Sequence, residues 1–442
     1  MSGQSTPPKL FGTDGVRGVA GEFLTADLAV ALGRAAATLS PTEAPQVLIV
    51  RDTRESGPTL EAALAAGVAA AGGHALLGGV LPTPGAALLV RRYGFDLAAV
   101  VSASHNPYRD NGIKFFGPEG TKIPDATERE MERLVQDPPA ERADGRVREL
   151  HGAGGDYLRE LESRFASLDL SGVRVLLDCA NGATYRVAPE IFRRLHADVE
   201  AIAADPDGRN INDGVGSTHV EALAERVSAG GHDLGFAFDG DGDRVLAVDR
   251  EGTVVDGDEL IAIAALHLRA ADRLPGGGVA VTVMTNYGFH TAMREHDIEV
   301  ATTPVGDRNV LAELIERGWA LGGEQSGHII DTGFVPSGDG VAAALLTLEA
   351  LAGRDLAARD AMSRLPQKLV NVRVGDRDKL DGATAVWEAV ERESDGLKDR
   401  GRVLVRPSGT EPLVRVMVEA PEAAECDAVT ARLVEVVERE LA

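Results

Sequence analysis

The sequence predicts a mainly α/β protein that ends in a smaller α+β domain. At roughly 150 residues per domain, a chain of 442 residues is long enough for about three domains, or for about four if one is small. Short β-branched runs alternate with longer segments rich in alanine and leucine, which is the pattern of βα units and parallel sheets. Near the C-terminus the order changes to strand, helix, hairpin and helix, which is typical of an α+β domain.

The first α/β domain is predicted over residues 1–155. A strand over Gln46–Val50 precedes a helix over about Pro58–Ala71, and the apolar strand Leu97–Val101 runs directly into a polar turn. Loops at such strand ends commonly carry function. The stretch Asp137–Glu149, rich in Pro, Asp and Arg, interrupts the periodicity and predicts a domain boundary soon after it.

Two further α/β domains are predicted over residues 156–256 and 257–366. The earlier of the two opens with the strand Val173–Asp178, and its last part, Val227–Arg250, holds another strand and an acidic turn. In the later one, the glycine-rich break Pro275–Gly278 is followed directly by a strand.

The smaller α+β domain is predicted over residues 367–442, after a helix-like segment over Asp339–Ala352. Its predicted strand, helix, hairpin and helix cover Leu369–Val374, Leu380–Glu393, Arg402–Val418 and Ala423–Glu440.

The composition excludes several classes of protein. Lys and Arg number 45 and Asp and Glu 69, a net charge of −24, so the long-range field repels nucleic acid and anionic membranes. The two cysteines, Cys179 and Cys426, are too few and too far apart for a disulfide scaffold or a thiolate zinc site. No apolar leader or long apolar stretch is visible. We expect a cytoplasmic protein that binds neither nucleic acid nor membranes and holds any anionic ligand in a locally basic pocket.

The motif S-A-S-H-N-P, Ser102–Pro107, directly follows a predicted strand. We expect Ser104 to be an exposed turn serine beside His105, able to act as a nucleophile toward phosphorus or carbon. The alternative is a helix cap or an ordinary Asx turn. No serine lies in a G-x-S-x-G motif, so an α/β-hydrolase site is not supported.

The motif D-G-D-G-D-R follows another predicted strand and contains Asp239, Asp241 and Asp243. In an extended segment these carboxylates would project to one side and repel one another unless a cation lay among them. Oxygen ligands select Mg²⁺ or Ca²⁺. An EF-hand loop would require glycine where Arg244 stands and glutamate where Arg250 stands, so Mg²⁺ is favoured. The alternative is a solvated acidic turn.

The motif G-G-E-Q-S-G-H contains Glu324, Ser326 and His328. Their alternation would place a carboxylate, a hydroxyl and an imidazole on one face of an extended turn, a set that suits sugar hydroxyls. The alternative is a simple polar connection between two elements.

The motif R-P-S-G-T-E-P begins at Arg406 and lies in the last predicted domain. Ser408, Gly409 and Thr410 could offer hydroxyl and backbone N–H groups to a phosphate, and Arg406 or Arg415 a charged fork. A tight hairpin turn is the alternative.

Two cations near the start of the chain could face the serine. Arg17 lies in F-G-T-D-G-V-R-G, and Lys114 lies in N-G-I-K-F-F just after the serine loop. Taken alone, each could equally be a solvated surface charge.

These motifs, in this order, resemble the phosphohexomutase superfamily from about Leu10 to the C-terminus, and within it the bacterial members that act on glucosamine phosphates. The resemblance implies four domains around a central cleft. Three would be related α/β domains with mixed sheets, and the fourth a smaller C-terminal α+β domain.

The resemblance also implies an intramolecular phosphotransferase, an isomerase. It would interconvert glucosamine 6-phosphate and glucosamine 1-phosphate through a phosphoserine enzyme and a sugar 1,6-bisphosphate intermediate. It assigns the phosphoserine to Ser104, and Mg²⁺ to Asp239, Asp241, Asp243 and a phosphoryl oxygen on Ser104. The resemblance further implies that the transferring group is flanked by Arg17, Lys114 and Arg244, and that the site is lined by His105 and His328. It implies that the sugar hydroxyls are contacted by Glu324 and Ser326. The non-reacting phosphate would be gripped by Arg406, Ser408, Gly409, Thr410 and Arg415.

Other functions stay open at this point. A phosphomannomutase or phosphoglucomutase would use the same serine and metal loops with a different sugar loop. A serine-dependent phosphomonoesterase would release inorganic phosphate instead, and a non-catalytic sugar-phosphate binder would need neither Ser104 nor the aspartates. We expect a small phosphosugar as the partner, and a homodimer is compatible with this expectation.

Overall fold

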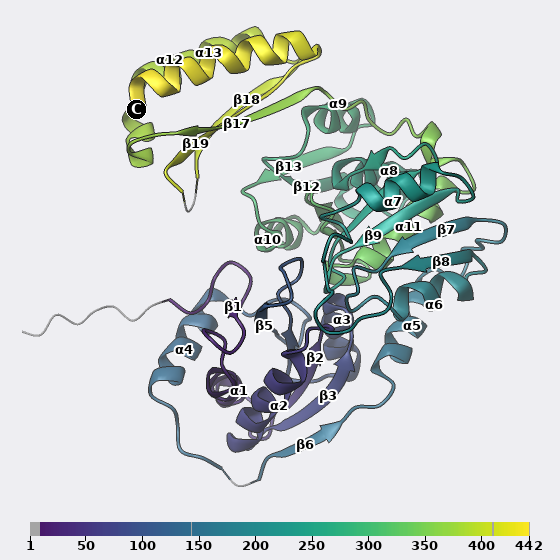
Figure 1. The fold of residues 1–442 in the computed structure, drawn as a ribbon, viewed down its shortest axis with the longest axis vertical. Coiled ribbons are helices and arrows are strands. Elements are labelled where there is room, and N and C mark those ends of the chain that lie inside the picture. The colour runs from purple at the N-terminus through teal and green to yellow at the C-terminus, as the bar shows by residue number, and fades with distance from the viewer. Residues whose placement is uncertain (1–8, 143, 409–410, 442) are drawn as a thin grey trace, which may run out of the picture. The chain divides into compact units, whose positions relative to one another are not determined.

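The computed structural model describes residues 9–142, 144–408 and 411–441 (Figure 1). These residues form two compact units. The larger unit comprises residues 9–283 and 301–359, and the smaller comprises residues 284–300 and 360–441. Among the described residues, no helix has the length and apolarity needed to cross a bilayer.

The first sheet of the larger unit is mixed. In spatial order its strands are β1 (Val16–Val19), β5 (Asp110–Phe116), β4 (Leu97–Val101), β2 (Gln46–Arg51), β3 (His74–Val80) and β6 (Arg146–Glu149). β5 runs antiparallel to both of its neighbours, and the other pairs are parallel. The strands predicted over Gln46–Val50 and Leu97–Val101 are confirmed as β2 and β4.

Two helices pack tightly together against one face of this sheet. They are α1 (Ala26–Leu39) and α2 (Gly57–Ala70), and their apolar side chains join those of Val47 and Ile49 in one core. A Cβ atom on Gly67 would lie 2.0 Å from the carbonyl oxygen of Val30, so only glycine allows the two helices to approach this closely. The helix predicted over Pro58–Ala71 is confirmed as α2. Helix α4 (Asp125–Gln136) contributes Met131 and Leu134 to the same core.

Helix α3 (Thr83–Tyr93) is packed between parts of the larger unit. It contacts β2 and β4 of the first sheet and also β16 and α5 of the following domains. Its first eight residues, 83–90, are all buried. The start of this helix is therefore held in the interior, where it meets the acidic turn described below.

The second sheet is also mixed. Its spatial order is β11 (Val254–Val255), β10 (Val245–Asp249), β9 (Leu234–Phe238), β7 (Arg174–Asp178) and β8 (Asp198–Ile202). Helices α5 (Ala153–Arg164), α6 (Val187–Arg194) and α7 (Glu221–Ser228) belong to the same part of the chain. The strand predicted over Val173–Asp178 is β7, one residue shorter.

The third sheet has the order β13 (Glu299–Thr303), β12 (Gly278–Thr282), β14 (Leu321–Gly323), β15 (Ile329–Asp331) and β16 (Val335–Gly338). Its helices in the larger unit are α8 (Gly257–Ala270), α10 (Asp307–Arg317) and α11 (Gly340–Leu351). The helix-like segment predicted over Asp339–Ala352 is α11. It begins one residue later because the Asp339 carboxylate caps it by accepting a hydrogen bond from the N–H of Ala342.

The three sheets share one arrangement of four core strands. Numbered by chain order within each domain, these strands lie in the order 4-3-1-2, as β5-β4-β2-β3, β10-β9-β7-β8 and β15-β14-β12-β13. In all three, the third strand is parallel to the first and antiparallel to the fourth. The expectation of three related α/β domains with mixed sheets is thereby confirmed.

The smaller unit contains an antiparallel sheet in the order β17 (Gln367–Arg373), β19 (Leu413–Glu419) and β18 (Arg402–Pro407). Helices α12 (Thr384–Gly396) and α13 (Ala423–Leu441) cover one face of it (Figure 1). Helix α9 (Tyr287–Glu295) belongs to this unit, where the N–H of Tyr287 donates to the Glu419 carboxylate. The expected α+β domain is confirmed. The helix predicted from Leu380 begins only at Thr384, because a 3₁₀ turn over Arg377–Gly382 ends in glycine and a non-helical Ala383.

Candidate active site

Three loops that carry sequence-predicted residues occupy the same place in their three domains. Each connects the third core strand to the antiparallel fourth strand: residues 102–109 lie between β4 and β5, 239–244 between β9 and β10, and 324–328 between β14 and β15. The loops meet inside the larger unit. Ser104 touches Asp239, and the N–H of Val245 donates to the carbonyl oxygen of Gly327 at 3.0 Å.

Ser104 is the centre of this meeting point. Its hydroxyl donates a hydrogen bond of 2.5 Å to Oδ2 of Asp239 and lies 3.2 Å from Nδ1 of His105. The expectation that this serine is exposed is wrong, because its relative exposure is 1%. The acidic turn of the second domain covers it, an arrangement that a strand-end motif cannot reveal. Ser104 also has a positive φ of 51°, a strained conformation for a residue with a side chain.

Two buried residues hold the serine loop in this conformation. The fully buried Arg54 guanidinium donates to the carbonyl oxygens of Ser104 and Asn106, each at 2.8 Å, and to the Asp52 carboxylate. The amide of Asn212, from the second domain, donates to the same two carbonyl oxygens at 2.9 and 3.1 Å. Sequence reasoning missed Arg54 and Asn212, because no local motif marks a side chain that binds a distant backbone.

The three aspartates form a buried cluster. One carboxylate oxygen from each of Asp239, Asp241 and Asp243 lies within 4.8 Å of the others. They converge through a turn rather than an extended segment: the N–H of Gly242, whose φ is +73°, donates to the carbonyl oxygen of Asp239 at 3.1 Å. Thr83, the first residue of α3, donates its hydroxyl to Oδ2 of Asp241 at 2.6 Å.

The donor set fits a divalent cation. Among the described residues, Oδ1 of Asp241 and Oδ1 of Asp243 are buried and lack a hydrogen-bond partner. Buried polar atoms in that state are costly unless an ion or water satisfies them. Burial raises the pKa of Asp239 well above its ordinary value, and the carboxylates of Asp243 and Asp241 raise it further. A hard cation would offset this mutual repulsion, and carboxylate oxygens are the ligands that Mg²⁺ prefers.

Lys114 and Arg244 surround the cluster with positive charge. Lys114 is buried on β5, and its Nζ lies 2.7 Å from Oδ2 of Asp241 and 3.1 Å from Oδ2 of Asp14. Burial would lower the pKa of Lys114, but these carboxylates outweigh it and hold the pKa above its usual range. The backbone N–H of Arg244 donates to Asp239 at 3.1 Å. The side chain of Arg244 lies 3.8 Å from the Asp243 carboxylate.

The positive charge also acts on His105. Burial lowers the pKa of the imidazole, and Arg244 and Arg17 lower it further by repelling a second proton. Arg17 forms an ion pair with Asp14. The structure therefore brings Arg17, His105 and Arg244 into one electrostatic environment next to Ser104.

The loop of the third domain completes the cavity. Glu324, Ser326 and His328 line a cavity of about 750 Å³, together with Arg17, His105 and Arg244. These loop residues converge through a tight turn rather than an extended one, since the N–H of Glu324 donates to the carbonyl oxygen of His328 at 3.0 Å. Oε1 of Glu324 accepts from the N–H of Gly306 at 3.0 Å, which fixes its orientation.

Asp14, Lys122 and Asp307 also line this cavity, and sequence reasoning did not select them. Lys122 forms ion pairs with both carboxylates, at 2.5 Å to Oδ1 of Asp14 and 2.6 Å to Oδ2 of Asp307. The only local signal was the presence of Asp14 within the glycine-rich motif around Arg17. Nothing local connects Lys122 with Asp307.

The smaller unit holds the predicted phosphate-binding residues. Arg406 on β18 is directly opposite Arg415 on β19 in the antiparallel ladder. Burial lowers the pKa of Arg406, and repulsion by Arg415 lowers it further. Among the described residues, Nε of Arg415 is buried without a hydrogen-bond partner. Two like charges on facing strands favour an anion between them. Ser408 is buried, whereas Gly409 and Thr410 lie outside the described residues.

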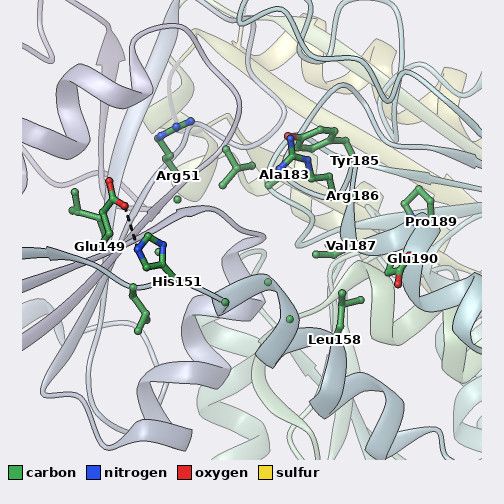
Figure 2. A pocket seen from close by; sticks show the side chains of 18 of the residues that line it. Arg51, Glu149, His151, Leu158, Ala183, Tyr185, Arg186, Val187, Pro189 and Glu190 are labelled. Atoms are coloured by element: carbon green, nitrogen blue, oxygen red, sulfur yellow. Dashed lines mark ion pairs between the residues drawn. The ribbon is translucent and has the colours of Figure 1, made fainter.

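Another cavity has a volume of about 990 Å³, and none of the described residues that line it is one that the sequence predicted for the site. Figure 2 shows it, with Arg51, Glu149 and His151 on one side and Tyr185 and Arg186 on the other. Its charged side chains include ion pairs, between Arg51 and Glu61 at 3.1 Å and between His151 and Glu149 at 3.5 Å. It therefore lacks the convergent carboxylates and cations found around Ser104.

Comparison with known families agrees with the arrangement of domains and motifs. Models of the phosphoglucomutase/phosphomannomutase family match four segments: alpha/beta/alpha domain I at residues 8–141, domain II at 155–252, domain III at 256–369 and the C-terminal domain at 369–436. The chain belongs to the phosphoglucomutase/phosphomannomutase family. The resemblance drawn from the motifs is thereby confirmed.

Relatives within the phosphoglucomutase/phosphomannomutase family match the chain over nearly its whole length. A phosphoglucosamine mutase of Moorella thermoacetica is 50% identical over 436 residues, covering 96% of this chain and 98% of the relative. A phosphoglucosamine mutase of Desulforudis audaxviator is 51% identical over 422 residues, covering 93% and 94%. The crystal structure of a family protein from Burkholderia thailandensis is similar with a TM-score of 0.83 and 25% identity, covering 97% of each chain.

Proposed function

We propose that this chain is a phosphoglucosamine mutase, an enzyme that interconverts glucosamine 6-phosphate and glucosamine 1-phosphate. The observation that carries the proposal is the hydrogen bond of 2.5 Å from Ser104 Oγ to Asp239 within a buried aspartate cluster. The relatives that are about half identical over the whole chain, and that bear this name, support the choice of substrate.

The proposed reaction uses Ser104 as a phosphoryl carrier. The phosphorylated Ser104 gives its phosphoryl group to the free hydroxyl of the bound sugar phosphate, and that hydroxyl loses its proton to a basic side chain of the site. The product is glucosamine 1,6-bisphosphate. Ser104 Oγ then takes back the other phosphoryl group, and a proton returns to the oxygen left on the sugar. Each step breaks one P–O bond and forms another.

Asp239, Asp241 and Asp243 would hold Mg²⁺, since their carboxylates converge and the buried, unpartnered oxygens of Asp241 and Asp243 fit such an ion. When bound, the ion supplies positive charge that offsets the charge on the phosphoryl oxygens. Arg17, Lys114 and Arg244 would contribute further positive charge around the same group. His105, whose Nδ1 lies 3.2 Å from Ser104 Oγ, together with Lys114 and His328, supplies the candidate proton carriers.

Glu324 and Ser326 are proposed to contact the sugar hydroxyls, because both line the cavity that also contains His105 and Arg244. Arg406 and Arg415, with the loop from Ser408 to Thr410, are proposed to hold the phosphate that is not reacting. A bisphosphate intermediate needs two anion sites, because each phosphate reacts in turn. The facing arginines of β18 and β19 supply charge of the right sign for the second site.

The test compares substrates and products side by side. Purified enzyme is charged with glucosamine 1,6-bisphosphate in the presence of Mg²⁺ and assayed with glucosamine, glucose and mannose 6-phosphates. We expect the highest kcat/KM for glucosamine 6-phosphate. A higher kcat/KM for a neutral hexose would assign the chain to phosphoglucomutase or phosphomannomutase activity. Stoichiometric release of inorganic phosphate without isomer formation would assign it to a phosphomonoesterase.

A further inference from the structure

Six side chains of the larger unit form a closed ring in which carboxylates alternate with basic groups. In order around the ring they are Asp14, Lys122, Asp307, His328, Asp243 and Lys114. Taken in the same order, the N–O distances between successive neighbours are 2.5, 2.6, 3.8, 3.6 and 3.8 Å. A sixth distance of 3.1 Å, from Lys114 to Asp14, closes the ring. Three of the members are residues that the proposed function already uses, namely Lys114, His328 and Asp243.

The ring joins the three α/β domains. Asp14 precedes β1, and Lys114 and Lys122 lie on and just after β5, all in the first domain. Asp243 lies in the turn after β9, whereas Asp307 begins α10 and His328 ends the loop after β14. Of the six ring contacts, the shortest between two domains joins Nζ of Lys122 to Oδ2 of Asp307 in the third domain, at 2.6 Å. The same Nζ atom lies 2.5 Å from Oδ1 of Asp14 within the first domain.

We propose that Lys122 is a positioning residue for phosphoryl transfer, holding the Asp14–Lys114 pair of the first domain in register with the Asp307–His328 pair of the third. The inference rests on the proposed function, because it concerns the geometry of that same site. Lys122 itself is not given a chemical step. Its effect passes through two carboxylates to two of the candidate proton carriers.

The positioning role of Lys122 has a physical basis, because its ammonium group balances the charge of two carboxylates that have little access to water. The side chain of Lys122 is 14% exposed, and those of Asp14 and Asp307 are 22% and 23% exposed. Without the ammonium group, the two carboxylates that share it would repel each other. Asp14 and Asp307 would then separate, and the side chains of Lys114 and His328 would move with them.

The charge states of the neighbours agree with this arrangement. Burial would lower the pKa of Lys122, but Asp14 and Asp307 outweigh it and raise the pKa above its ordinary value. Burial would likewise raise the pKa of Asp307, but Lys122 and then His328 outweigh it and lower the pKa. His328 is also held at the nitrogen that faces Asp307, because the N–H of Gly338 donates to its Nε2 at 3.1 Å. A small displacement of Asp307 would therefore change the position of the His328 imidazole.

The experiment compares Lys122→Met with Lys122→Arg in the full chain. Methionine keeps most of the length of the side chain and removes its charge, whereas arginine keeps the charge. We expect Lys122→Met to lower kcat for glucosamine 6-phosphate by about 10-fold to 100-fold with little change in KM, since misplacing reacting groups by about 1 Å costs rates of that order. Lys122→Arg should restore most of the loss.

A matched control removes another cation of the first domain. Arg133 on α4 forms an exposed ion pair with Glu130 at 2.7 Å, so Arg133→Met should leave kcat unchanged. A second readout is the single-turnover discharge of the phosphoenzyme onto glucosamine 6-phosphate, followed by intact mass. Its rate constant should fall by the same factor as kcat in Lys122→Met.

Asp307→Asn provides a second variant that removes the other half of the bridge. It should reproduce the loss of kcat, and the double variant Lys122→Met/Asp307→Asn should lose less than the two single losses combined. Wild-type kcat in Lys122→Met, an equal loss in Lys122→Arg, or a loss confined to KM would overturn the inference. If the wild type turned over another hexose phosphate instead, the proposed function would fail, and the same comparison with that substrate would still test Lys122.

Discussion

Ser104 and Asp239 lie in equivalent turns of two different sheets, and the Ser104 hydroxyl donates a hydrogen bond of 2.5 Å to Oδ2 of Asp239. Both side chains are buried, at 1% and 0% relative exposure. Because each turn connects the third and fourth core strands of its own domain, the packing of related domains brings the candidate nucleophile into contact with the buried aspartate cluster. The domain arrangement therefore builds the centre of the site.

The first prediction concerns the phosphoryl carrier. Ser104→Ala removes the atom that accepts the phosphoryl group, so kcat should fall by a factor on the order of 10⁴ or more, as when a catalytic nucleophile is removed. The fold should remain, because the substitution removes one oxygen and leaves the Asp239 carboxylate with one hydrogen bond fewer, at a cost of about 1–3 kcal/mol. Steady-state kinetics, intact mass and thermal unfolding check these outcomes. Multiple turnovers near the wild-type rate would remove Ser104 from the mechanism.

The second prediction concerns the cation. Asp241→Asn keeps the size of the side chain but removes a charge from the buried cluster, so Mg²⁺ affinity measured by titration calorimetry should fall by at least about tenfold. The matched control is Asp198→Asn, which neutralises an exposed aspartate on β8 that lies 3.6 Å from Arg174. It should bind Mg²⁺ like the wild type. Chelation of the metal should abolish turnover, and added Mg²⁺ should restore it. Equal Mg²⁺ affinity in both variants would argue against the cluster as the metal site.

The third prediction concerns stability and pH. Asp339, the N-cap of α11, is buried and accepts hydrogen bonds from the Tyr157 hydroxyl at 2.9 and 3.0 Å. Burial raises its pKa to about 6 from an ordinary value of 3.8. Since the folded protein then binds a proton more tightly than the unfolded chain, stability from this group is present below about pH 4 and is lost as pH rises to about 6.

The Asp339→Asn variant isolates that contribution, because asparagine can keep the cap and accept from Tyr157 without ionising. Relative to this variant, the free energy of unfolding of the wild type should fall by up to about 3 kcal/mol between about pH 4 and about pH 6. This figure is the pKa shift of Asp339 converted at about 1.4 kcal/mol per pKa unit. Thermal unfolding of both proteins across this range measures the difference. Parallel pH profiles for the two proteins would show that Asp339 does not titrate in this window.

The fourth prediction concerns the facing arginines of the smaller unit. Arg406→Gln removes one of two like charges on opposite strands, so it should weaken binding of the non-reacting phosphate and raise KM by about tenfold, the effect of a lost charged hydrogen bond of about 1.5 kcal/mol. The unit itself should be no less stable, because the repulsion from Arg415 is gone. Arg373→Gln, which changes an exposed arginine on β17 of the same sheet, is the control. An unchanged KM in Arg406→Gln would exclude Arg406 from phosphate binding.

The amino-acid sequence by itself was enough to locate β4 and β9 and the polar turns that follow them. An apolar run that ends in S-A-S-H-N-P or D-G-D-G-D-R indicates a buried strand followed by a polar loop, and β4 and β9 end where that pattern places them. These signals are local, since side-chain alternation and turn-forming residues act over a few positions.

The burial of Ser104, the support from Arg54 and Asn212 and the bridge through Lys122 depend on tertiary structure alone. Each of these features relies on contacts between residues that are far apart in the chain. The periodicity of one segment carries no information about which distant segment it will contact. A lysine such as Lys122 is mostly found in water. It is half-buried here because two domains each bring a carboxylate to the same ammonium group, and only the packing of those domains determines that contact.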